Sequence, residues 1–401
     1  MQAIVLAAGE GSRMKPLTSR LPKVMLPVAG RPLLEHIIAR ALKAGARNII
    51  LVIGYGADSI RSHFGDGSSI GIEIDYAVQE RQLGTGDALM AAESQAHDRF
   101  LVLNGDVIPD IESLRIIASS DEEAVAAIKV SDPGRYGVFL EDGGYIKSVI
   151  EKSPNPQSNL ANAGIYLFKR SVFDALAQVN LSKRGEYELT DALNILAKKE
   201  RIRIIELKEW MEIGRPWDIL SANEMLLKSI ERRIEGSVES GAVLNGDISV
   251  GRGTIIRSGA YITGPVIIGE ECDIGPNCYI RPSTCIGNKV RIGNAVEVKN
   301  SVVMDGTKIG HLSYVGDSII GSDSNFGAGT ICANLRHDKA SVKSYVKGVM
   351  VNSGRRKLGA IIGDNVYTGI HTTIYPGTVI ESEFRGFPAA ILNGFVSAKG
   401  D

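Results

Sequence analysis

The sequence predicts a chain in two parts, an α/β domain with a mixed, largely parallel sheet followed by a solenoid of short stacked strands. Residues 1 to about 215 alternate short apolar runs with amphipathic stretches, which is typical of α/β domains. From Val238 to Met304 an aliphatic residue recurs every six positions. A period of six fits neither the 3.6 residues of a helical turn nor the alternation of a strand, so it indicates a repeat architecture.

The first part contains alternating strands and helices. Apolar runs predict strands over 3–6, 49–53, 72–76, 100–103 and 201–207, and amphipathic runs predict helices over 33–43, 86–93 and 189–198. Apolar residues from Ile219 to Ile234 then advance by three or four, which predicts one helix over 217–235 that Gly236 ends. We therefore divide the chain into an α/β domain over 1–216, a linker helix over 217–236 and the repeat domain over 237–401.

The repeat predicts the geometry of the second part. Its aliphatic positions are Val238, Leu244, Val250, Ile256, Ile262, Ile268, Ile274, Ile280, Ile286, Ile292, Val298 and Met304, and the fourth residue after each of the first eleven is small or β-branched. This resembles the hexapeptide repeat of left-handed parallel β-helices. Since 18 residues make three sides, residues 18 apart should stack at about 4.8 Å, the spacing of paired strands.

The repeat is interrupted further along the chain. Its phase slips by one at Ile309 and again at Ile320, and it returns at Ile362 after an irregular stretch over 335–359, which we expect to form an excursion loop. An open solenoid must cover its faces or ends. We therefore predict a homo-oligomer.

Composition narrows the class of protein. The formal net charge of -1 provides no electrostatic reason to expect a nucleic acid or an anionic membrane as partner. No apolar run approaches the ~20 residues of a membrane span, and the stretch Ala3–Ala8 lacks the basic region of a signal peptide. We expect a cytoplasmic protein that acts on small molecules. The cysteines at 272, 278, 285 and 332 all lie in the repeat, which predicts buried thiols.

Several motifs in the first part follow strand ends. Gly9, Gly11 and Arg13 lie in a loop directly after the first strand, where backbone N–H groups and a guanidinium can approach phosphates. Alone, such a loop is more often a plain turn. Here Lys23 follows a proline, a polar turn contains Gln79, Gly84 and Thr85, and Asp106 stands just past a strand end. Ligands of open α/β sheets bind at such strand ends.

The order of these motifs resembles the sugar-1-phosphate nucleotidylyltransferase family across residues 1–216. The resemblance implies that Ala8, Gly9, Gly11 and Arg13 hold a nucleoside triphosphate and that Lys23 binds phosphate at the reacting centre. It implies a pyrimidine nucleotide, UTP or dTTP, recognised by Gln79, Gly84 and Thr85. Sugar contacts would come from Gly137, Glu151 and Asn162.

A displacement at phosphorus suits a hard cation such as Mg²⁺, held by carboxylates and phosphate oxygens. The resemblance makes Asp106 the first ligand and places the second in a Trp-x-Asp-Ile-Gly motif. This chain reads Trp210-Met-Glu212-Ile-Gly214, so the second carboxylate is one methylene longer. The structural alternatives are a helix N-cap for Asp106 and a solvated charge at a strand end for Glu212.

The repeat domain carries a second group of polar residues. Arg281 and Lys299 are 18 residues apart, so they should lie on neighbouring coils. Adjacent cations repel unless an anion lies between them, and a sugar phosphate would supply that charge. A solvated pair of surface charges is the alternative. His311 and Tyr314 follow Lys299, and Asn325 and Asn334 come after them.

This set resembles the acetyltransferase half of bifunctional glucosamine-1-phosphate N-acetyltransferase/N-acetylglucosamine-1-phosphate uridylyltransferases. The resemblance implies that His311 is the general base for attack of the sugar amine on acetyl-CoA, as an imidazole with a pKa near 6.5 can be. It assigns the phosphate to Arg281 and Lys299 and the sugar to Tyr314 and Asn325. Asn334 would lie near the reacting amine, and Ala328 and Lys343 beside the coenzyme. Family resemblance suggests a trimer.

The chain departs from bacterial members after Asn334, where Leu335 replaces the usual tyrosine, and the run 353–359 is more similar to archaeal relatives. Galactosamine-1-phosphate and dTTP therefore stay open as substrates. Our leading hypothesis is one chain with two active sites that makes UDP-N-acetylglucosamine. The first alternative is a nucleotidylyltransferase for glucose- or mannose-type phosphates with a non-catalytic β-helix. The second is a regulatory subunit without activity, which the retained Arg13, Lys23 and Asp106 disfavour.

Overall fold

The computed structural model describes residues 1–398 and divides into two compact units. The first unit consists of Met1–Glu10, Pro22–Met25 and Leu33–Glu212. The second consists of Gly11–Leu21, Leu26–Pro32 and the chain from Ile213 onward. Two short N-terminal segments thus pack with the repeat, which no local sequence pattern indicated. The division into functional domains at residue 216 stays a prediction.

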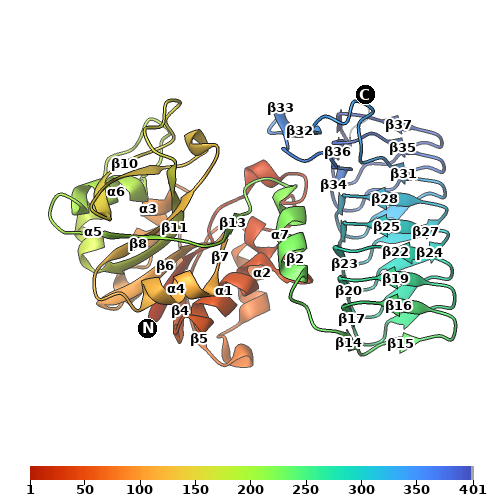
Figure 1. The fold of residues 1–401 in the computed structure, drawn as a ribbon, viewed down its shortest axis with the longest axis horizontal. Coiled ribbons are helices and arrows are strands. Elements are labelled where there is room, and N and C mark those ends of the chain that lie inside the picture. Colours follow the sequence, from red (N-terminus) through yellow and green to blue (C-terminus); the bar gives the residue numbers. More distant parts are fainter. Residues whose placement is uncertain (399–401) are drawn as a thin grey trace. The chain divides into compact units, whose positions relative to one another are not determined.

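The first unit is built on a mixed nine-stranded sheet (Figure 1). In spatial order its strands are β5 (Glu73–Val78), β4 (Asn48–Ile53), β1 (Gln2–Leu6), β6 (Arg99–Asn104), β11 (Leu160–Lys169), β8 (Ala124–Lys129), β12 (Arg203–Glu206), β10 (Tyr145–Ile150) and β9 (Val138–Asp142). The strands from β5 to β6 are parallel, and β11 runs antiparallel between β6 and β8. The carboxyl ends of β1 and β6 therefore lie at the same edge.

Helices cover this sheet, and those predicted over 33–43, 86–93 and 189–198 are found close to these positions, whereas three others were not predicted. They are α1 (Leu33–Lys43), α2 (Ala57–Phe64), α3 (Thr85–Met90), α4 (Ile111–Ala118), α5 (Ser171–Leu176) and α6 (Leu189–Leu196). A two-stranded ribbon pairs β7 (Val107–Pro109) with β13 (Trp210–Glu212). The N-cap of α4 is Asp110, whose side chain accepts a hydrogen bond of 2.8 Å from the Ser113 N–H. Asp106 is therefore not a helix cap.

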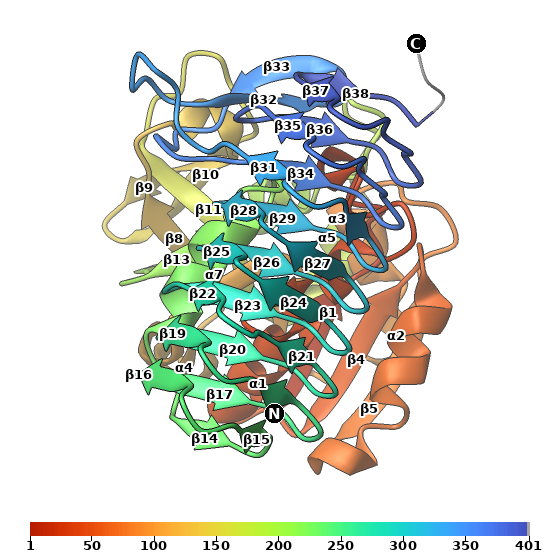
Figure 2. The ribbon, with the colours of Figure 1, turned by 90° about the vertical axis from the view of Figure 1, so that its right-hand side faces the viewer.

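The repeat forms a β-helix of three parallel ladders, whose coils stack in Figures 1 and 2, as the predicted left-handed β-helix requires. The first ladder contains β14 (Arg233–Ile234), β17 (Ile248–Val250), β20 (Val266–Ile268), β23 (Thr284–Ile286), β26 (Val302–Val303), β29 (Ile319–Ile320), β34 (Ile361–Ile362), β36 (Val379–Ile380) and β38 (Phe395–Val396). The second contains β15 (Ser237–Val238), β18 (Ile255–Ile256), β21 (Asp273–Ile274), β24 (Arg291–Asn294), β27 (Lys308–His311) and β30 (Asn325–Phe326). The third contains β16 (Val243–Asn245), β19 (Tyr261–Thr263), β22 (Tyr279–Ile280), β25 (Glu297–Lys299), β28 (Tyr314–Gly316), β31 (Ile331–Cys332), β35 (Thr373–Ile374) and β37 (Ile391–Leu392).

The predicted spacing of 18 residues is confirmed in the early coils, where Ile262 pairs with Ile280. The one-residue shift in the phase of the repeat occurs at Val303, one repeat before the predicted shift at Ile309. Ile286 pairs with Val303 and not with Met304. Val303 joins the core of the β-helix, so assigning Met304 to the inward repeat position was wrong. The run Val302-Val-Met304 consists of three apolar residues, so its pattern allows either phase.

The excursion loop over 335–359 is confirmed. Leu335 bridges to Lys357, and the ladder resumes where Ile320 pairs with Ile362. Inside the loop, β32 (Lys343–Val346) and β33 (Val349–Asn352) form an antiparallel hairpin that the sequence analysis did not predict. The two ends of the loop therefore meet beside Asn334.

The helix predicted over 217–235 is shorter, since α7 spans Asp218–Leu227. Ile234 instead pairs with Val250 in the first ladder, because the coils begin before Val238. Within the second unit, α7 packs against β2 (Pro27–Val28), which pairs with β3 (Arg31–Pro32). The buried Asn223 of α7 accepts from the Ala29 N–H at 3.0 Å and donates to the Ser283 carbonyl at 2.8 Å. These bonds fix α7 on the β-helix.

Two further predictions have an outcome. All four cysteines are free and buried, as predicted, and burial raises the pKa of Cys278, Cys285 and Cys332 to about 12. Within residues 1–398, no helix combines the length and apolar character needed to cross a membrane.

Candidate active sites

The glycine loop leaves the carboxyl end of β1. Gly11 has a left-handed backbone with φ of 69°, and the 3₁₀ turn η1 (Ser12–Met14) follows with Arg13 exposed. Next to β1, the Gly105 N–H donates to the Leu6 carbonyl at 2.9 Å, and a Cβ at Gly105 would lie 2.6 Å from that oxygen. Glycine at 105 therefore lets the end of β6 approach β1. The loop crosses the division of the chain, with Gly9 in the first unit and Gly11 in the second.

Two of the predicted phosphate and metal residues form an ion pair. Lys23, in the 3₁₀ turn η2 (Lys23–Met25), places its Nζ 2.5 Å from Oδ2 of Asp106. The side chains are 14% and 18% exposed, so both are accessible from one side. A lysine beside a carboxylate suits a centre where phosphates and a cation meet, since each charge can exchange its partner for a ligand.

The surroundings of Asp106 fit a magnesium ion. Glu212 pairs in register with Val107, the residue after Asp106, so the ribbon brings the backbone of the second predicted ligand close to that of the first. Asn104, two residues before Asp106, has a buried Oδ1 with no hydrogen-bond partner among the described residues. Those residues contain no cluster of three or more His, Cys, Asp or Glu side chains. A donor set with few carboxylates suits Mg²⁺, which keeps waters and substrate phosphates as ligands.

The predicted base-recognition residues form one tight turn. The buried Gln79 donates from Nε2 to the Gly84 carbonyl at 3.0 Å and to Asp87 at 2.7 Å. Gly84 has φ of 104°, and a Cβ there would lie 2.7 Å from the Tyr187 carbonyl. Thr85 accepts from the Leu189 N–H at 3.2 Å. Gln79 therefore shapes the glycine turn, and the segment around Tyr187 supports it.

The predicted sugar residues lie together, with Gly137 just before β9, Glu151 just after β10 and Asn162 in β11. The Asn162 N–H donates to the Gly137 carbonyl at 2.8 Å. A Cβ at Gly137 would lie 2.7 Å from Oε2 of Glu151, which accepts from Thr190 at 3.2 Å. A larger residue at 137 would therefore displace the Glu151 carboxylate, which now faces this position.

In the second unit, Lys299, Tyr314 and Asn334 converge on Asp317. Lys299 Nζ lies 2.8 Å from Oδ2 of Asp317, and Asn334 Nδ2 donates to the same oxygen at 2.5 Å. Asn334 also donates to the Tyr314 hydroxyl at 3.1 Å. Burial, together with the negative charge of Asp317, raises the pKa of Tyr314, so its hydroxyl stays protonated at neutral pH.

Arg281 lies on the neighbouring coil, as the 18-residue spacing predicts. Its backbone N–H donates to the Val298 carbonyl at 2.9 Å, which places it beside Lys299. However, its guanidinium binds Glu297 at 2.8 Å, while Lys299 binds Asp317. Each cation therefore has its own carboxylate, and the assignment of a sugar phosphate to this pair stays a prediction.

His311 and Asn325 lie on the second ladder, and Ala328 follows shortly after its last strand. None of the three belongs to the Asp317 cluster. His311 is exposed at the end of β27, and its carbonyl accepts from the Gly329 N–H at 3.2 Å. Asn325 pairs with Lys308 at the start of β30. The turn at Leu312 and Ser313 separates His311, at the end of β27, from Tyr314, at the start of β28. His311 and the Asp317 cluster therefore lie on adjacent sides of the coil.

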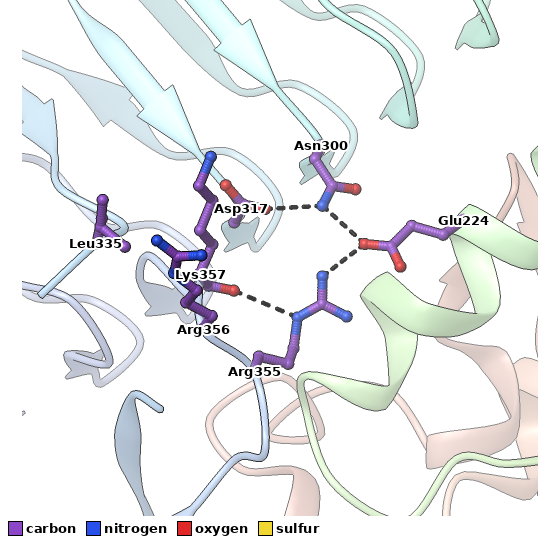
Figure 3. A pocket seen from close by; sticks show the side chains of 7 residues that line it. All are labelled: Glu224, Asn300, Asp317, Leu335, Arg355, Arg356 and Lys357. Atoms are coloured by element: carbon purple, nitrogen blue, oxygen red, sulfur yellow. Dashed lines mark hydrogen bonds and ion pairs between the residues drawn. The ribbon is translucent and has the colours of Figure 1, made fainter. Parts of the chain in front are cut away.

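Sequence reasoning assigned no role to Asp317, Glu224 and Asn300, and it offered Arg355 to Lys357 only as possible contacts to the coenzyme phosphates, with an exposed basic loop as the alternative. A cavity of about 510 Å³ lies beside Asp317, and Figure 3 shows its lining residues: Glu224, Asn300, Asp317, Leu335, Arg355, Arg356 and Lys357. Lys299 pairs in register with Gly316, the residue before Asp317, because the slip shortens the spacing between these coils to 17. Glu224 and Asn300 gave no signal in the sequence, because their partners are remote in sequence or lie in an irregular loop.

The fold and these two sites define a nucleotidyltransferase joined to a β-helix. A family model described as "Nucleotidyl transferase" matches residues 2–229, and a model described as "GMPPB C-terminal domain" matches residues 262–380. Among solved structures, a UDP-glucose pyrophosphorylase complexed with UDP-glucose is 25% identical with a TM-score of 0.53, covering 57% of this chain and 98% of that one. This likeness covers little more than half of the chain.

Relatives that match over both halves extend the assignment. A bifunctional sugar-1-phosphate nucleotidylyltransferase/acetyltransferase of Sulfurisphaera tokodaii is 42% identical over 98% of this chain and 97% of its own. The bifunctional protein GlmU of Methanococcus maripaludis strain C7 is 44% identical over 95% and 92%. The chain belongs to the family of bifunctional sugar-1-phosphate nucleotidylyltransferases/acetyltransferases, and the predicted bifunctional enzyme is confirmed at this level.

Proposed function

We propose that the chain synthesises UDP-N-acetylglucosamine in two steps. The second unit transfers acetyl from acetyl-CoA to the amine of glucosamine-1-phosphate. The first unit then joins the product to UMP from UTP and releases pyrophosphate. The observation that carries this proposal is the identity of 42% to a bifunctional relative over 98% of the chain, because it spans both sites at once.

In nucleotidyl transfer, catalysis is alignment and charge neutralisation. The sugar-phosphate oxygen attacks the α-phosphorus, and the bond to pyrophosphate breaks. Lys23 and Arg13 neutralise phosphate oxygens, and Ala8, Gly9 and Gly11 contribute backbone contacts. Asp106 and Glu212 would hold Mg²⁺, which supplies Lewis-acid charge at the phosphates. Gln79, Gly84 and Thr85 receive the pyrimidine, and Gly137, Glu151 and Asn162 receive the sugar.

In the second unit, His311 takes a proton from the sugar ammonium or amine, the nitrogen attacks the thioester carbonyl, and the coenzyme thiolate leaves. Lys299 and Arg281 bind the sugar phosphate through the N–H groups that do not bond to Asp317 and Glu297. Tyr314 and Asn325 position the sugar, and Asn334 lies by the reacting amine. Ala328 and Lys343 line the coenzyme path.

The distribution of the proposed acetyl-transfer residues over two ladders supports a homo-oligomer. Within one chain, His311 and Asn325 lie on a different ladder from Lys299 and Tyr314. The third ladder also exposes Tyr261, Tyr279 and Ile331, at 44%, 38% and 38%. A homo-oligomer, most simply a trimer, would cover these side chains and complete the site from two copies. The expected cytoplasmic location stays a prediction.

One panel tests the substrates. Glucosamine-, galactosamine- and N-acetylglucosamine-1-phosphate are each incubated with and without acetyl-CoA, against UTP and dTTP, with Mg²⁺ present. We expect glucosamine-1-phosphate to yield a nucleotide-linked N-acetyl sugar only when acetyl-CoA is added. Pyrophosphate release from every sugar phosphate without any acetyl transfer would reject the two-step synthesis.

That rejecting outcome describes the alternative function, a nucleotidylyltransferase for glucose- or mannose-type phosphates with a non-catalytic β-helix. The match of residues 262–380 to the GMPPB C-terminal domain favours it, because that likeness covers the repeat. Glucose- and mannose-1-phosphate therefore belong in the same panel. The alternative requires that they be used faster than N-acetylglucosamine-1-phosphate.

A further inference from the structure

Asp317 is a buried anchor at the proposed acetyl-transfer site. Its side chain is 3% exposed, and it accepts three hydrogen bonds, from Lys299 and Asn334 on Oδ2 and from Asn300 Nδ2 at 2.8 Å on Oδ1. A buried carboxylate is tolerated only when its oxygens have such partners. The position of Lys299 and Asn334 therefore depends on that of Asp317.

Asn300 connects this anchor to α7. It stands at a corner of the coil with a left-handed φ of 46°, a conformation that asparagine tolerates. Its Nδ2 donates to Asp317 and also to Oε1 of Glu224 at 2.7 Å. Both neighbours are carboxylates, so the amide must present its nitrogen to them.

Glu224 also anchors the excursion loop. Arg355 donates from Nη2 to Oε1 of Glu224 at 2.5 Å and from Nη1 to Ser221 at 2.8 Å, and its side chain is 17% exposed. The Leu358 N–H donates to the Asn334 carbonyl at 3.0 Å, so the returning end of the loop is tied to the proposed site. Figure 3 shows Glu224 between Asn300 and Arg355. One carboxylate thus joins the helix, the coil corner and the loop.

We propose that Glu224 is a positioning residue of the acetyl-transfer site, through which α7 sets Asp317, and with it Lys299 and Asn334, for the amino-sugar phosphate. This rests on the proposed acetyltransferase function. Without Glu224, the guanidinium of Arg355 loses its carboxylate partner. Asp317 lines the same cavity as Arg355. In the absence of Glu224, the Arg355 guanidinium therefore competes with Lys299 and Asn334 for the carboxylate of Asp317.

The test compares Glu224→Ala, Arg355→Ala and the double variant in the full-length protein. We expect Glu224→Ala to raise the KM for glucosamine-1-phosphate about tenfold and to change kcat less than about threefold, because it disturbs the phosphate and amine contacts and not the base. The double variant should have a KM no higher than that of Glu224→Ala, because removing Arg355 removes the competing cation.

Controls separate the outcomes. Glu231→Ala removes an exposed acid near α7 and should leave the KM at the wild-type value. Uridylyl transfer should stay unchanged in every variant. If Glu224→Ala does not fold, Glu224→Gln decides, since the amide keeps the size but loses the charge and should raise the KM about threefold.

Two results would overturn the proposal. One is an unchanged KM in the folded Glu224 variant. The other is a double variant whose KM increase equals the product of the single increases, which would make the two residues independent. A wild-type protein that does not acetylate glucosamine-1-phosphate would instead reject the proposed function itself.

Discussion

The two units each contain a lysine paired with an aspartate, and the surroundings of the two pairs differ. Lys23 lies 2.5 Å from Asp106, and Lys299 lies 2.8 Å from Asp317. Asp106 is 18% exposed, and Lys23 is its one hydrogen-bond partner within residues 1–398. Asp317 is 3% exposed and accepts from three side chains.

The difference shows that neighbours, and not residue type, determine the role of such a pair. Asp106 keeps lone pairs for a further ligand, which suits a residue that binds a cation in one step of a reaction. Asp317 has satisfied oxygens and little exposure, which suits a fixed scaffold under Lys299 and Asn334. The same pair is therefore an open ligand site in the first unit and a structural anchor in the second.

The largest expected effect tests whether the second unit has an active site at all. His311→Ala removes the proposed base, so acetyl transfer to glucosamine-1-phosphate should fall by about 10²–10⁴-fold. Uridylyl transfer to N-acetylglucosamine-1-phosphate should be unchanged, because His311 is not among the residues proposed for nucleotidyl transfer. Release of the coenzyme thiol and of pyrophosphate, followed in parallel, measures both. Undiminished thiol release would reject His311 as the general base, and with it the proposed acetyl-transfer site beside Asp317.

Asp106→Asn addresses the open pair. The amide keeps the shape but loses the charge, so uridylyl transfer should fall by about 10²–10³-fold, the order that loss of one electrostatic group costs. Acetyl transfer is the internal control. The free energy of unfolding should change by less than about 1 kcal/mol, because the pair is partly solvated. A large loss of stability would show that Asp106 is an anchor like Asp317.

Asp317→Asn addresses the anchored pair and should give the opposite balance. The amide leaves Lys299, which is 18% exposed, without a carboxylate partner. Its own N–H groups also face the donors that now bond to Asp317. We expect the free energy of unfolding to fall by about 2–4 kcal/mol, which chemical denaturation of the full chain measures. Uridylyl transfer should be retained. Wild-type stability in this variant would remove the distinction between the two pairs.

A smaller effect is expected from Glu212→Asp, which shortens the second proposed metal ligand. Glu212 lies opposite Val107 on a short ribbon, so one methylene changes the reach of the carboxylate but not its direction. The apparent affinity for Mg²⁺ should change within about tenfold, in either direction, because a ligand is moved and not removed. Titration of uridylyl transfer with Mg²⁺ measures it. A loss as large as that of Asp106→Asn would mean that Glu212 is as essential as Asp106.

The sequence predicted most of what depends on local periodicity. Helix α1 spans Leu33–Lys43 as predicted, and the six-residue repeat predicted the stacking of the coils. Its errors have physical causes. Met304 follows two valines, so hydrophobicity alone could not choose the phase, and Ile234 fits helical spacing while its backbone pairs with Val250.

Prediction of the sites followed the same limit. Motifs after strand ends identified Lys23, Asp106 and Gly137 by resemblance, and the fold then brought them beside their partners. The link from Glu224 to Arg355 joins a helix to an irregular loop that lies 131 positions away in sequence, and no period connects them. Contacts of that kind become visible only when the chain is folded.

A third carboxyl group extends the comparison, and it has the smallest expected effect. Glu123 in the first unit is 4% exposed and accepts from the Lys169 N–H at 2.8 Å. Burial, with a contribution from the neighbouring Glu200, raises the pKa of Glu123 to about 7 from its ordinary value of 4.5. The folded protein therefore keeps a proton at pH values between 4.5 and 7 that the unfolded chain releases.

The consequence is a stability that is fully present below pH 4.5 and is lost as the pH rises through about 7. Glu123→Gln stays neutral throughout, so it should flatten this part of the stability curve and gain on the order of 1 kcal/mol relative to the wild type at pH 8. Denaturant unfolding at several pH values checks it, with the exposed neighbour Glu122→Gln as control. Parallel curves for Glu123→Gln and the wild type would mean that the carboxyl group titrates alike in both states. Burial would then have no effect on the pKa of Glu123. The three carboxyl groups would no longer form one series, in which Asp106 is open to ligands, Asp317 is enclosed by hydrogen-bond donors and Glu123 is buried with a proton.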